Sequence, residues 1–257
     1  MTLVTLCSPA VSVGGEVAPF SHHLLHQTLQ AHVDSTGLVN YEGLRDDPAA
    51  LDDYVDSLAI VSPVSSAQRF RRRNDQLAYW INAYNALVLH SVISAYPIAS
   101  VADLGGLDGF FKKRLHVVGG DSVSLNHIEN EIIRPQFRDP RIHFAVNCGA
   151  ASCPALYQRA YDGGDIEEHL DQQTRRFASD PGHLRWQDGS LYVSRLLEWY
   201  RQDFVETDSS DAALIAFLQS YAPPKLAASM HEHATSIRFL DYDWHLNVQP
   251  RKEGEGE

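Results

Sequence analysis

The feature that most constrains the fold of this chain is an apolar segment over residues 77–96. Drawn as a helix, the segment has apolar side chains on nearly every face: Leu77, Tyr79, Trp80, Ile81, Tyr84, Leu87, Val88, Leu89, Val92 and Ile93. A helix that is apolar all round is stable only when other elements cover it on most sides. Pro97 ends the helix, because proline cannot continue the hydrogen-bond ladder. The pattern therefore predicts one buried central helix around which the rest of the chain packs.

Two amides interrupt this apolar pattern. Asn82 and Asn85 lie three residues apart, so they share one face of the predicted helix. Buried amides need hydrogen-bond partners. In one interpretation they tie neighbouring backbone to the helix; in the other they orient a functional site, which Trp80 would also line.

The remaining patterns predict further helices and a few short strands. Helical spacing of apolar residues occurs over about 20–33, 47–58, 166–178 and 212–221, and shorter helices follow the capping residues Ser124 or Asn126 and Ser194. Residues 110–118 and 122–125 flank Gly119-Gly120 as a predicted hairpin; a second hairpin over 183–193 turns at Asp188-Gly189, and a short strand covers 236–240. This is an α+β pattern: a mostly helical single domain with its buried central helix packed on a small, mainly antiparallel sheet.

The predicted domain boundaries follow from where such patterns begin and end. Residues 1–17 carry no helical or strand pattern and are expected to be a disordered or extended arm. Residues 18–248 form the predicted domain, and the charged, glycine-bearing residues 249–257 form a disordered tail.

Charge and hydropathy exclude several classes of partner. A formal net charge of −12 argues against binding to nucleic acid, which depends on clustered Lys and Arg. The sequence lacks an apolar run of the roughly 18 residues that a membrane span needs, so we expect no membrane insertion. The N-terminus lacks basic residues before its apolar part, which predicts a cytoplasmic protein, or a periplasmic or secreted one if a signal sequence has been removed.

Candidate chemistry is concentrated in residues 139–154. Asp139-Pro140 is a turn signal, and residues 142–146 read as a short strand that carries His143. A loop of small residues follows, with Cys148 and Cys153. Pro154 suits the first turn of a helix, and a thiol at a helix N-terminus is stabilised as thiolate.

These residues predict a cysteine-dependent hydrolase or acyl transferase. Cys153 is the predicted nucleophile, His143 its base and Glu129 the group that orients the imidazole. Asn82 or Asn85 would face the oxyanion. Asn147, Cys148 and Ser152 would line the site together with Trp80. The sequence contains no cofactor-binding or metal-binding motif, so we expect neither a cofactor nor a metal, and the substrate is a small molecule or peptide.

Three alternatives remain open at this point. Cys148 and Cys153 have a C-x4-C spacing that permits a reversible disulfide, as in a thiol–disulfide redox protein or a module that binds a thiol ligand such as glutathione, although we expect reduced thiols in a chain this long. The same cysteines with His143 and either His116 or His127 are a candidate zinc set of unusual spacing. Finally, aromatic residues around Trp199 and Tyr242 are a candidate partner surface of a non-catalytic module.

Several blocks of this sequence resemble the DUF547 family, a domain of unknown function. The blocks are Tyr79-Trp80-Ile81-Asn82-Ala83-Tyr84-Asn85, Ile128-Glu129 with Arg134-Pro135, Asp139 to Pro154, Ser194 with Glu198-Trp199-Tyr200 and Asp203-Phe204, and Tyr242-Asp243-Trp244 with Leu246-Asn247. The resemblance implies a domain found in bacteria, plants and animals, sometimes fused to glutaredoxin-like modules. It also implies a distant kinship to papain-like and transglutaminase-like thiol enzymes. Those enzymes usually place their cysteine at the start of the central helix, where this chain has Gln76 and Leu77.

Overall fold

The computed structural model describes residues 17–205, 209–233 and 236–250. The predicted terminal segments lie outside these described residues, with the exception of Val17, Gln249 and Pro250. Cys7, the third cysteine of the chain, also lies outside them. The α-helices are α1 (His23–His32), α2 (Tyr41–Asp46), α3 (Ala49–Ile60), α4 (Arg73–Ile93), α5 (Gly106–Asp108), α6 (Leu125–His127), α7 (Arg134–Phe137), α8 (Ile166–Ser179), α9 (Leu196–Trp199), α10 (Arg201–Phe204), α11 (Asp211–Gln219) and α12 (Pro224–His233). Shorter helical turns are the 3-10 turns η1 (Ala67–Arg69), η2 (Val101–Asp103) and η5 (Pro140–Phe144) and the π turns η3 (Gly109–Lys113) and η4 (Ile128–Ile133).

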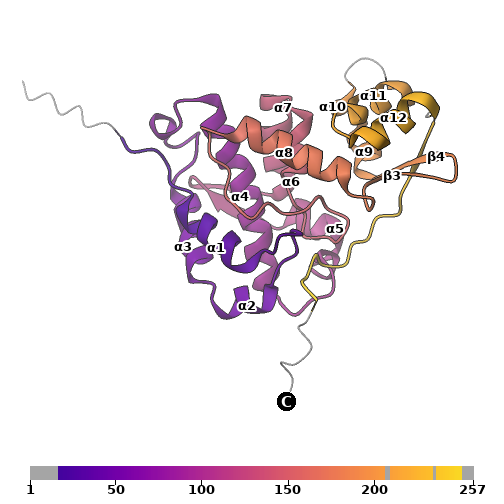
Figure 1. Ribbon diagram of the computed structural model, residues 1–257. Coiled ribbons are helices and arrows are strands. Elements are labelled where there is room, and N and C mark those ends of the chain that lie inside the picture. The colour runs from indigo at the N-terminus through magenta and orange to yellow at the C-terminus, as the bar shows by residue number, and fades with distance from the viewer. Residues whose placement is uncertain (1–16, 206–208, 234–235, 251–257) are drawn as a thin grey trace, which may run out of the picture.

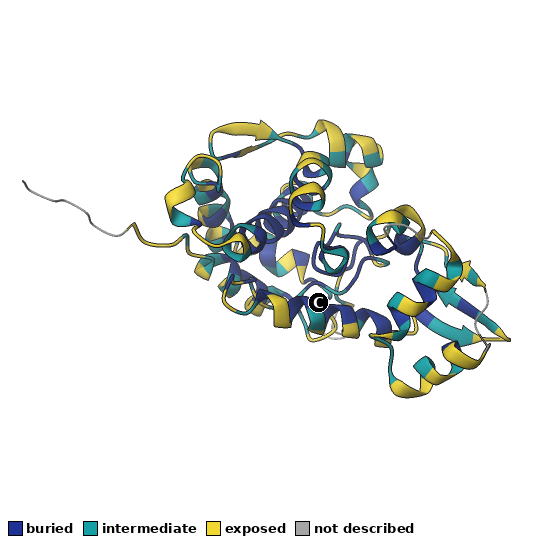
Figure 2. Cartoon of the chain, turned by 90° about the horizontal axis from the view of Figure 1, so that it is seen from above, coloured by how far each residue is buried: buried dark blue, intermediate teal, exposed yellow. Residues whose placement is uncertain are grey.

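Helix α4 is the predicted buried central helix. Every residue from Leu77 to Leu89 is buried, and the helix ends before the predicted breaker Pro97. Its main packing partners are α2, α3, α6 and η4. In Figure 2 the helix lies at the centre as a dark blue rod inside helices with exposed outer faces. The α+β class is confirmed, and the direct neighbours of the central helix are mostly other helices.

Two small sheets complete the fold. Strands β1 (His116–Val118) and β2 (Asp121–Val123) form the first predicted hairpin, with Val117 opposite Ser122. Strands β3 (Leu184–Gln187) and β4 (Ser190–Val193) form the second, and β5 (Ile237–Phe239) joins β4 in parallel. The first hairpin is shorter than predicted, because residues 109–113 form the π turn η3 instead of a strand.

The described residues contain two hydrophobic cores. The larger surrounds α4, and the smaller lies between α9 to α12 and the three-stranded sheet, seen at the upper right of Figure 1. The turn η5 contributes to both, since Ile142 is buried in the larger core and Phe144 in the smaller. The two cores are therefore joined by the segment that the sequence marks as chemically rich.

Two predicted elements in that segment are wrong. Residues 140–144 form the 3-10 turn η5, not a strand, because the Asp139 side chain accepts a hydrogen bond from the Arg141 backbone N–H and Pro140 suits the first helical position. No helix follows Pro154, because its carbonyl accepts a hydrogen bond from Asn147 and that of Ala155 accepts one from Gln173. The helix-dipole argument for a Cys153 thiolate therefore does not hold.

Helix α12 was not predicted. It begins at Pro224, because proline is favoured in the first turn of a helix. After β5 the chain returns from the smaller core to the larger one, as the yellow segment of Figure 1 shows. This returning segment brings residues 242–247 to the cysteine loop.

Candidate functional site

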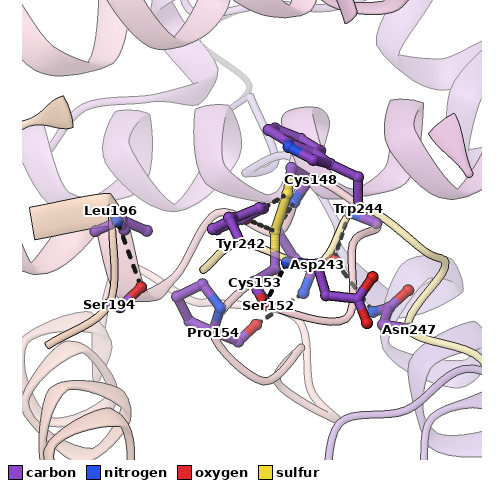
Figure 3. The surroundings of a disulfide bond; sticks show 12 residues. Cys148, Ser152, Cys153, Pro154, Ser194, Leu196, Tyr242, Asp243, Trp244 and Asn247 are labelled. Carbon is purple, nitrogen blue, oxygen red and sulfur yellow. Dashed lines mark hydrogen bonds between the residues drawn. A yellow bond between two sulfur atoms is a disulfide. The ribbon is translucent and has the colours of Figure 1, made fainter. Parts of the chain in front are cut away.

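Cys148 and Cys153 form a disulfide in this structure, with their Cα atoms 6.2 Å apart (Figure 3). The expectation of reduced thiols is therefore wrong, and the C-x4-C spacing does place the two cysteines at bonding distance. Cys153 is only 7% exposed, whereas Cys148 is partly exposed. The backbone N–H of Cys148 donates a hydrogen bond to the Cys153 sulfur over 3.0 Å.

The loop between the cysteines is held by Asn147. The Asn147 side chain donates to the Pro154 carbonyl over 2.8 Å and accepts from the Gly149 N–H over 2.8 Å, so it bridges both ends of the loop. Gly149 has a φ of +82°, and a Cβ atom there would lie 3.1 Å from Val101. The backbone conformation therefore favours glycine at this position, and the close contact with Val101 adds to that preference.

The two amides of α4 clamp flanking segments to the central helix. Asn85 donates to the Ala145 carbonyl over 2.9 Å and accepts from the Asn147 N–H over 2.8 Å. Asn82 makes the same pair of hydrogen bonds with the backbone of Tyr161, over 2.8 and 2.9 Å. The interpretation in which these amides tie neighbouring backbone to the helix therefore describes both residues.

The returning C-terminal segment pairs with the cysteine loop. The Ala151 N–H donates to the His245 carbonyl over 2.7 Å, and the Asp243 N–H donates to Ser152 Oγ over 2.9 Å. This pairing places Tyr242 against the disulfide, with its Oη 3.2 Å from each sulfur (Figure 3). A residue 89 positions after Cys153 in the sequence thus contacts both reactive atoms.

The disulfide lies in the wall of a cavity of about 340 Å³. A volume of this size is within the range of small-molecule sites. Among the residues that line the cavity are Glu129, His143, Cys148 and Cys153, together with the aromatic side chains Tyr84, Phe111, Trp199, Tyr200, Tyr242 and Trp244. The structure therefore brings the three predicted catalytic residues to one concave place.

An aromatic wall formed by Trp199, Tyr242 and Trp244 bounds one side of this cavity. The ring centroids lie 4.8 Å apart for Trp199 and Tyr242, 4.6 Å for Tyr242 and Trp244, and 5.9 Å for the two indoles. Trp199 is 46% exposed. Trp199 and Tyr242, which the sequence offers as a candidate partner surface, thus form part of the cavity wall.

His143 is oriented by Asp203, not by Glu129 as predicted. The imidazole Nε2 lies 2.7 Å from Asp203 Oδ2, and the same carboxylate binds the guanidinium of Arg134 through two hydrogen bonds. Although burial opposes ionisation of Asp203, the hydrogen bonds from His143 and Arg134 hold the pKa of this carboxyl well below its usual value. An ionised carboxylate only accepts hydrogen bonds, so Nε2 carries the proton of a neutral His143.

The other ring nitrogen of His143 has no partner. Nδ1 is buried and makes no hydrogen bond to any described residue, while the ring stacks on Tyr200 with centroids 4.0 Å apart. In a neutral imidazole whose Nε2 is protonated, Nδ1 is an acceptor with a free electron pair. Such a nitrogen has the chemistry of a general base, although it has almost no exposed surface in this structure.

Glu129 lies among tyrosines instead of beside His143. It is 7% exposed and is held in the π turn η4, a type of turn that is frequent at functional sites. Burial raises the pKa of Tyr84, Tyr200 and Tyr242, and the charge of the nearby Glu129 carboxylate raises it further. These hydroxyls therefore stay protonated and remain hydrogen-bond donors.

The other residues predicted to line the site lie elsewhere. Trp80 is 4% exposed and packs edge-to-face on Tyr79, with ring centroids 5.1 Å apart, and it belongs to the larger core. Asn82, Asn85, Asn147 and Ser152 are also absent from the cavity lining, because their side chains bind backbone groups. They support the site from outside. Within the described ranges no three His, Cys, Asp or Glu side chains are grouped so that they could hold a metal ion.

A protein-family model matches part of this chain. The family model described as "Protein of unknown function, DUF547" matches residues 68–178. The match confirms the resemblance over these residues, whereas the blocks at residues 194–204 and 242–247 lie outside it. No curated protein and no solved structure matches the chain.

The DUF547 match covers only part of the cavity. It includes α4, Glu129, His143 and both cysteines, whereas Tyr200, Asp203 and the aromatic wall lie C-terminal to it. Asp203, Trp199, Tyr242 and Trp244 belong to the blocks that resemble the family, but the sequence assigns Asp203 no role. Its place in such a block, Ser194 to Phe204, is the signal that pointed to it. Along the described chain, no helix is both long and apolar enough to cross a membrane.

Proposed function

We propose that this DUF547 protein is a thiol–disulfide exchange protein whose reactive group is the Cys148–Cys153 pair. The observation that carries the proposal is the Tyr242 hydroxyl 3.2 Å from each sulfur in the wall of a ligand-sized cavity. A structural cystine needs neither an adjacent cavity nor a protonated hydroxyl beside it. A reactive one gains from both, because a thiol must enter and a thiolate must leave.

The surroundings of the two sulfurs indicate which sulfur is attacked and which one leaves. The Cys153 sulfur has two potential donors, the Cys148 N–H and the Tyr242 hydroxyl, whereas the Cys148 sulfur has only the Tyr242 hydroxyl. The additional donor stabilises a thiolate on Cys153, which is therefore the better leaving group, and the greater exposure of Cys148 opens its sulfur to attack. A substrate thiolate attacks Cys148 Sγ, the S–S bond breaks, and Cys153 leaves as a thiolate held by these donors. A second substrate thiolate then attacks the mixed disulfide on Cys148, which yields the substrate disulfide and the reduced protein.

Single-cysteine variants test this assignment. In a Cys7→Ser background, the Cys153→Ser variant treated with 2-hydroxyethyl disulfide is expected to gain one mercaptoethanol unit on Cys148. The matched Cys148→Ser variant is expected to react at least about tenfold more slowly, because its remaining sulfur is largely buried. Intact mass against time measures both reactions. Equal rates would contradict the proposed direction of attack.

The reduction potential separates an exchangeable cystine from a structural one. Structural disulfides have potentials below about −300 mV, whereas exchange proteins lie at about −120 to −270 mV. Equilibration with dithiothreitol redox buffers, read by alkylation and mass, gives the value. A potential below about −300 mV would refute exchange as the function. A value in the exchange range would also fit the cytoplasm, the compartment that we propose from the sequence.

A second function is favoured by the Arg134–Asp203–His143 chain of hydrogen bonds. In the reduced protein, Cys153 as nucleophile, His143 as base and Asp203 as its orienting group would form a thiol hydrolase or acyl transferase. The test is alkylation of Cys153 by iodoacetamide as a function of pH, in a Cys7→Ser, Cys148→Ser background with and without His143→Gln. Reaction near neutral pH that depends on His143 supports this function. A profile that rises only near the free-thiol pKa of about 8.5 in both variants contradicts it.

A further inference from the structure

The cavity contains a buried negative charge without a cation of its own. Glu129 is 7% exposed, and none of the ion pairs among the described residues includes it. The guanidinium of Arg134, which interacts electrostatically with Glu129, is occupied by two hydrogen bonds to Asp203 and one to Asn130 over 2.6 Å. Two carboxylates, those of Asp203 and Glu129, therefore share one guanidinium.

Neutral groups already surround this carboxylate. The hydroxyls of Tyr84 and Tyr200 hydrogen-bond to Glu129. A protonated tyrosine donates a hydrogen bond but carries no charge, so it leaves the negative charge of Glu129 uncompensated. Glu129 lines the cavity, so a ligand cation can supply that charge.

The aromatic wall of the cavity suits a cation as well. Trp199, Tyr242 and Trp244 present adjoining aromatic rings, and the electron-rich faces of such rings attract ammonium and guanidinium groups. The other charges that line the cavity, Asp108 and Lys112, neutralise each other through a 2.8 Å ion pair. The uncompensated charge is therefore that of Glu129.

We propose that the cavity binds a small organic cation, whose N–H groups reach Glu129 and whose carbon chain lies against the aromatic wall. For the proposed exchange reaction, the substrate is then a thiol or disulfide that carries a protonated amine. This assignment of the substrate rests on the proposed function. Binding of the cation requires only the cavity.

Binding of n-butylammonium and its neutral analogue n-butanol to the oxidised protein tests the cation site. Titration calorimetry is expected to give n-butylammonium a Kd at least about tenfold lower than that of n-butanol. The preference should fall below about threefold in Glu129→Gln, which keeps the shape of the side chain and removes its charge. The control Glu131→Gln removes an exposed charge from the same π turn and should keep the preference. Equal Kd values in the parent chain, or a preference that survives in Glu129→Gln, would overturn the proposal.

The aromatic wall is tested by a variant at its exposed member. Trp199→Leu should weaken n-butylammonium binding about fivefold, because a leucine offers no electron-rich face. Trp199 is 46% exposed, so the variant is expected to fold. An unchanged Kd in this variant would contradict the role of the wall.

A comparison of two thiol substrates separates a failure of the cationic substrate class from a failure of the proposed exchange function. Exchange rates of cysteamine and 2-mercaptoethanol with the oxidised protein are compared per thiolate, and cysteamine should be at least about tenfold faster. The advantage should vanish in Glu129→Gln. Equal rates for the two thiols would overturn the cationic substrate class while leaving exchange intact. No exchange with either thiol would overturn the proposed function and leave the n-butylammonium result valid.

Discussion

Individual side chains around the cystine have separable tasks. Tyr242 contacts the sulfurs, Asp203 orients His143, and Asn147 holds the loop. Each of these contacts joins side chains or backbone groups that are positioned by different parts of the chain. The chemistry of the site therefore depends on a few hydrogen bonds that can be removed one at a time.

Removal of the Tyr242 hydroxyl should slow exchange without disturbing the aromatic wall. Tyr242→Phe keeps the ring between Trp199 and Trp244 and loses the donor to the leaving sulfur. Loss of one such hydrogen bond, about 1 kcal/mol, corresponds to a rate about fivefold lower. Stopped-flow reduction by dithiothreitol measures this rate. The control Tyr192→Phe alters a ring on β4, between Arg185 and Arg238, and should react like the parent chain.

Asp203 should make the stability of the protein depend on pH. Its folded-state pKa lies below the unfolded value of about 3.9, so its contribution is complete above that value and is lost as pH falls toward the folded pKa. Asp203→Asn should therefore lower the free energy of unfolding by about 2 kcal/mol at pH 7. The difference from the parent should shrink below about pH 4. Urea unfolding at several pH values tests this, and a difference that stays constant down to pH 2 would refute it.

Whole elements are joined by side chains buried in α4. This helix runs through the centre of the larger core and, through Asn82 and Asn85, holds two irregular segments whose backbones form no regular hydrogen-bond ladder. One of these segments leads directly into the cysteine loop. The central helix thus determines where the cystine lies, although no residue of α4 touches either sulfur through a hydrogen bond.

The Asn85→Ala variant should be strongly destabilised. The substitution leaves the Ala145 carbonyl and the Asn147 N–H without partners in a buried place, at a cost of about 2–4 kcal/mol. The control Asn74→Ala, near the start of the same helix, loses one exposed contact of 3.4 Å and should cost less than about 0.5 kcal/mol. Urea unfolding followed by circular dichroism measures both variants. Equal losses would contradict the clamping role of Asn85.

Considered as a whole, the molecule should not need its disulfide to fold. The bond closes a loop between cysteines only five positions apart, whose entropy is worth about 2 kcal/mol in the chain-entropy description. Two hydrophobic cores remain when it is broken. Reduction by a phosphine should therefore lower the free energy of unfolding by about 2 kcal/mol and leave the chain folded at 25 °C.

The matched control for this measurement is the Cys148→Ser, Cys153→Ser double variant. Its stability should equal that of the reduced parent chain and should not change when the reductant is added. Unfolding of the parent chain on reduction would identify the cystine as a structural staple and contradict the exchange proposal.

Local patterns in the sequence were sufficient for the central helix, both hairpin turns and the position of the cysteines near His143. Each depends on neighbours along the chain: apolar spacing for α4, and glycines with positive φ at 119, 120 and 189 for the turns. The same local reasoning failed for residues 140–144, where capping by Asp139 outweighed strand propensity. Local signals of this kind compete, and their relative strength depends on packing that the sequence does not display.

The partners of the site residues could be found only in the folded chain. Asp203 lies 60 positions from His143, and Tyr242 lies 94 positions from Cys148. Such contacts arise because the C-terminal segment returns from the smaller core and pairs with the cysteine loop. Periodicity and capping act over a few residues, whereas a long-range hydrogen bond depends on how complete elements pack. The amino-acid order therefore specified the reactive groups, and packing selected which carboxylate and which tyrosine act on them.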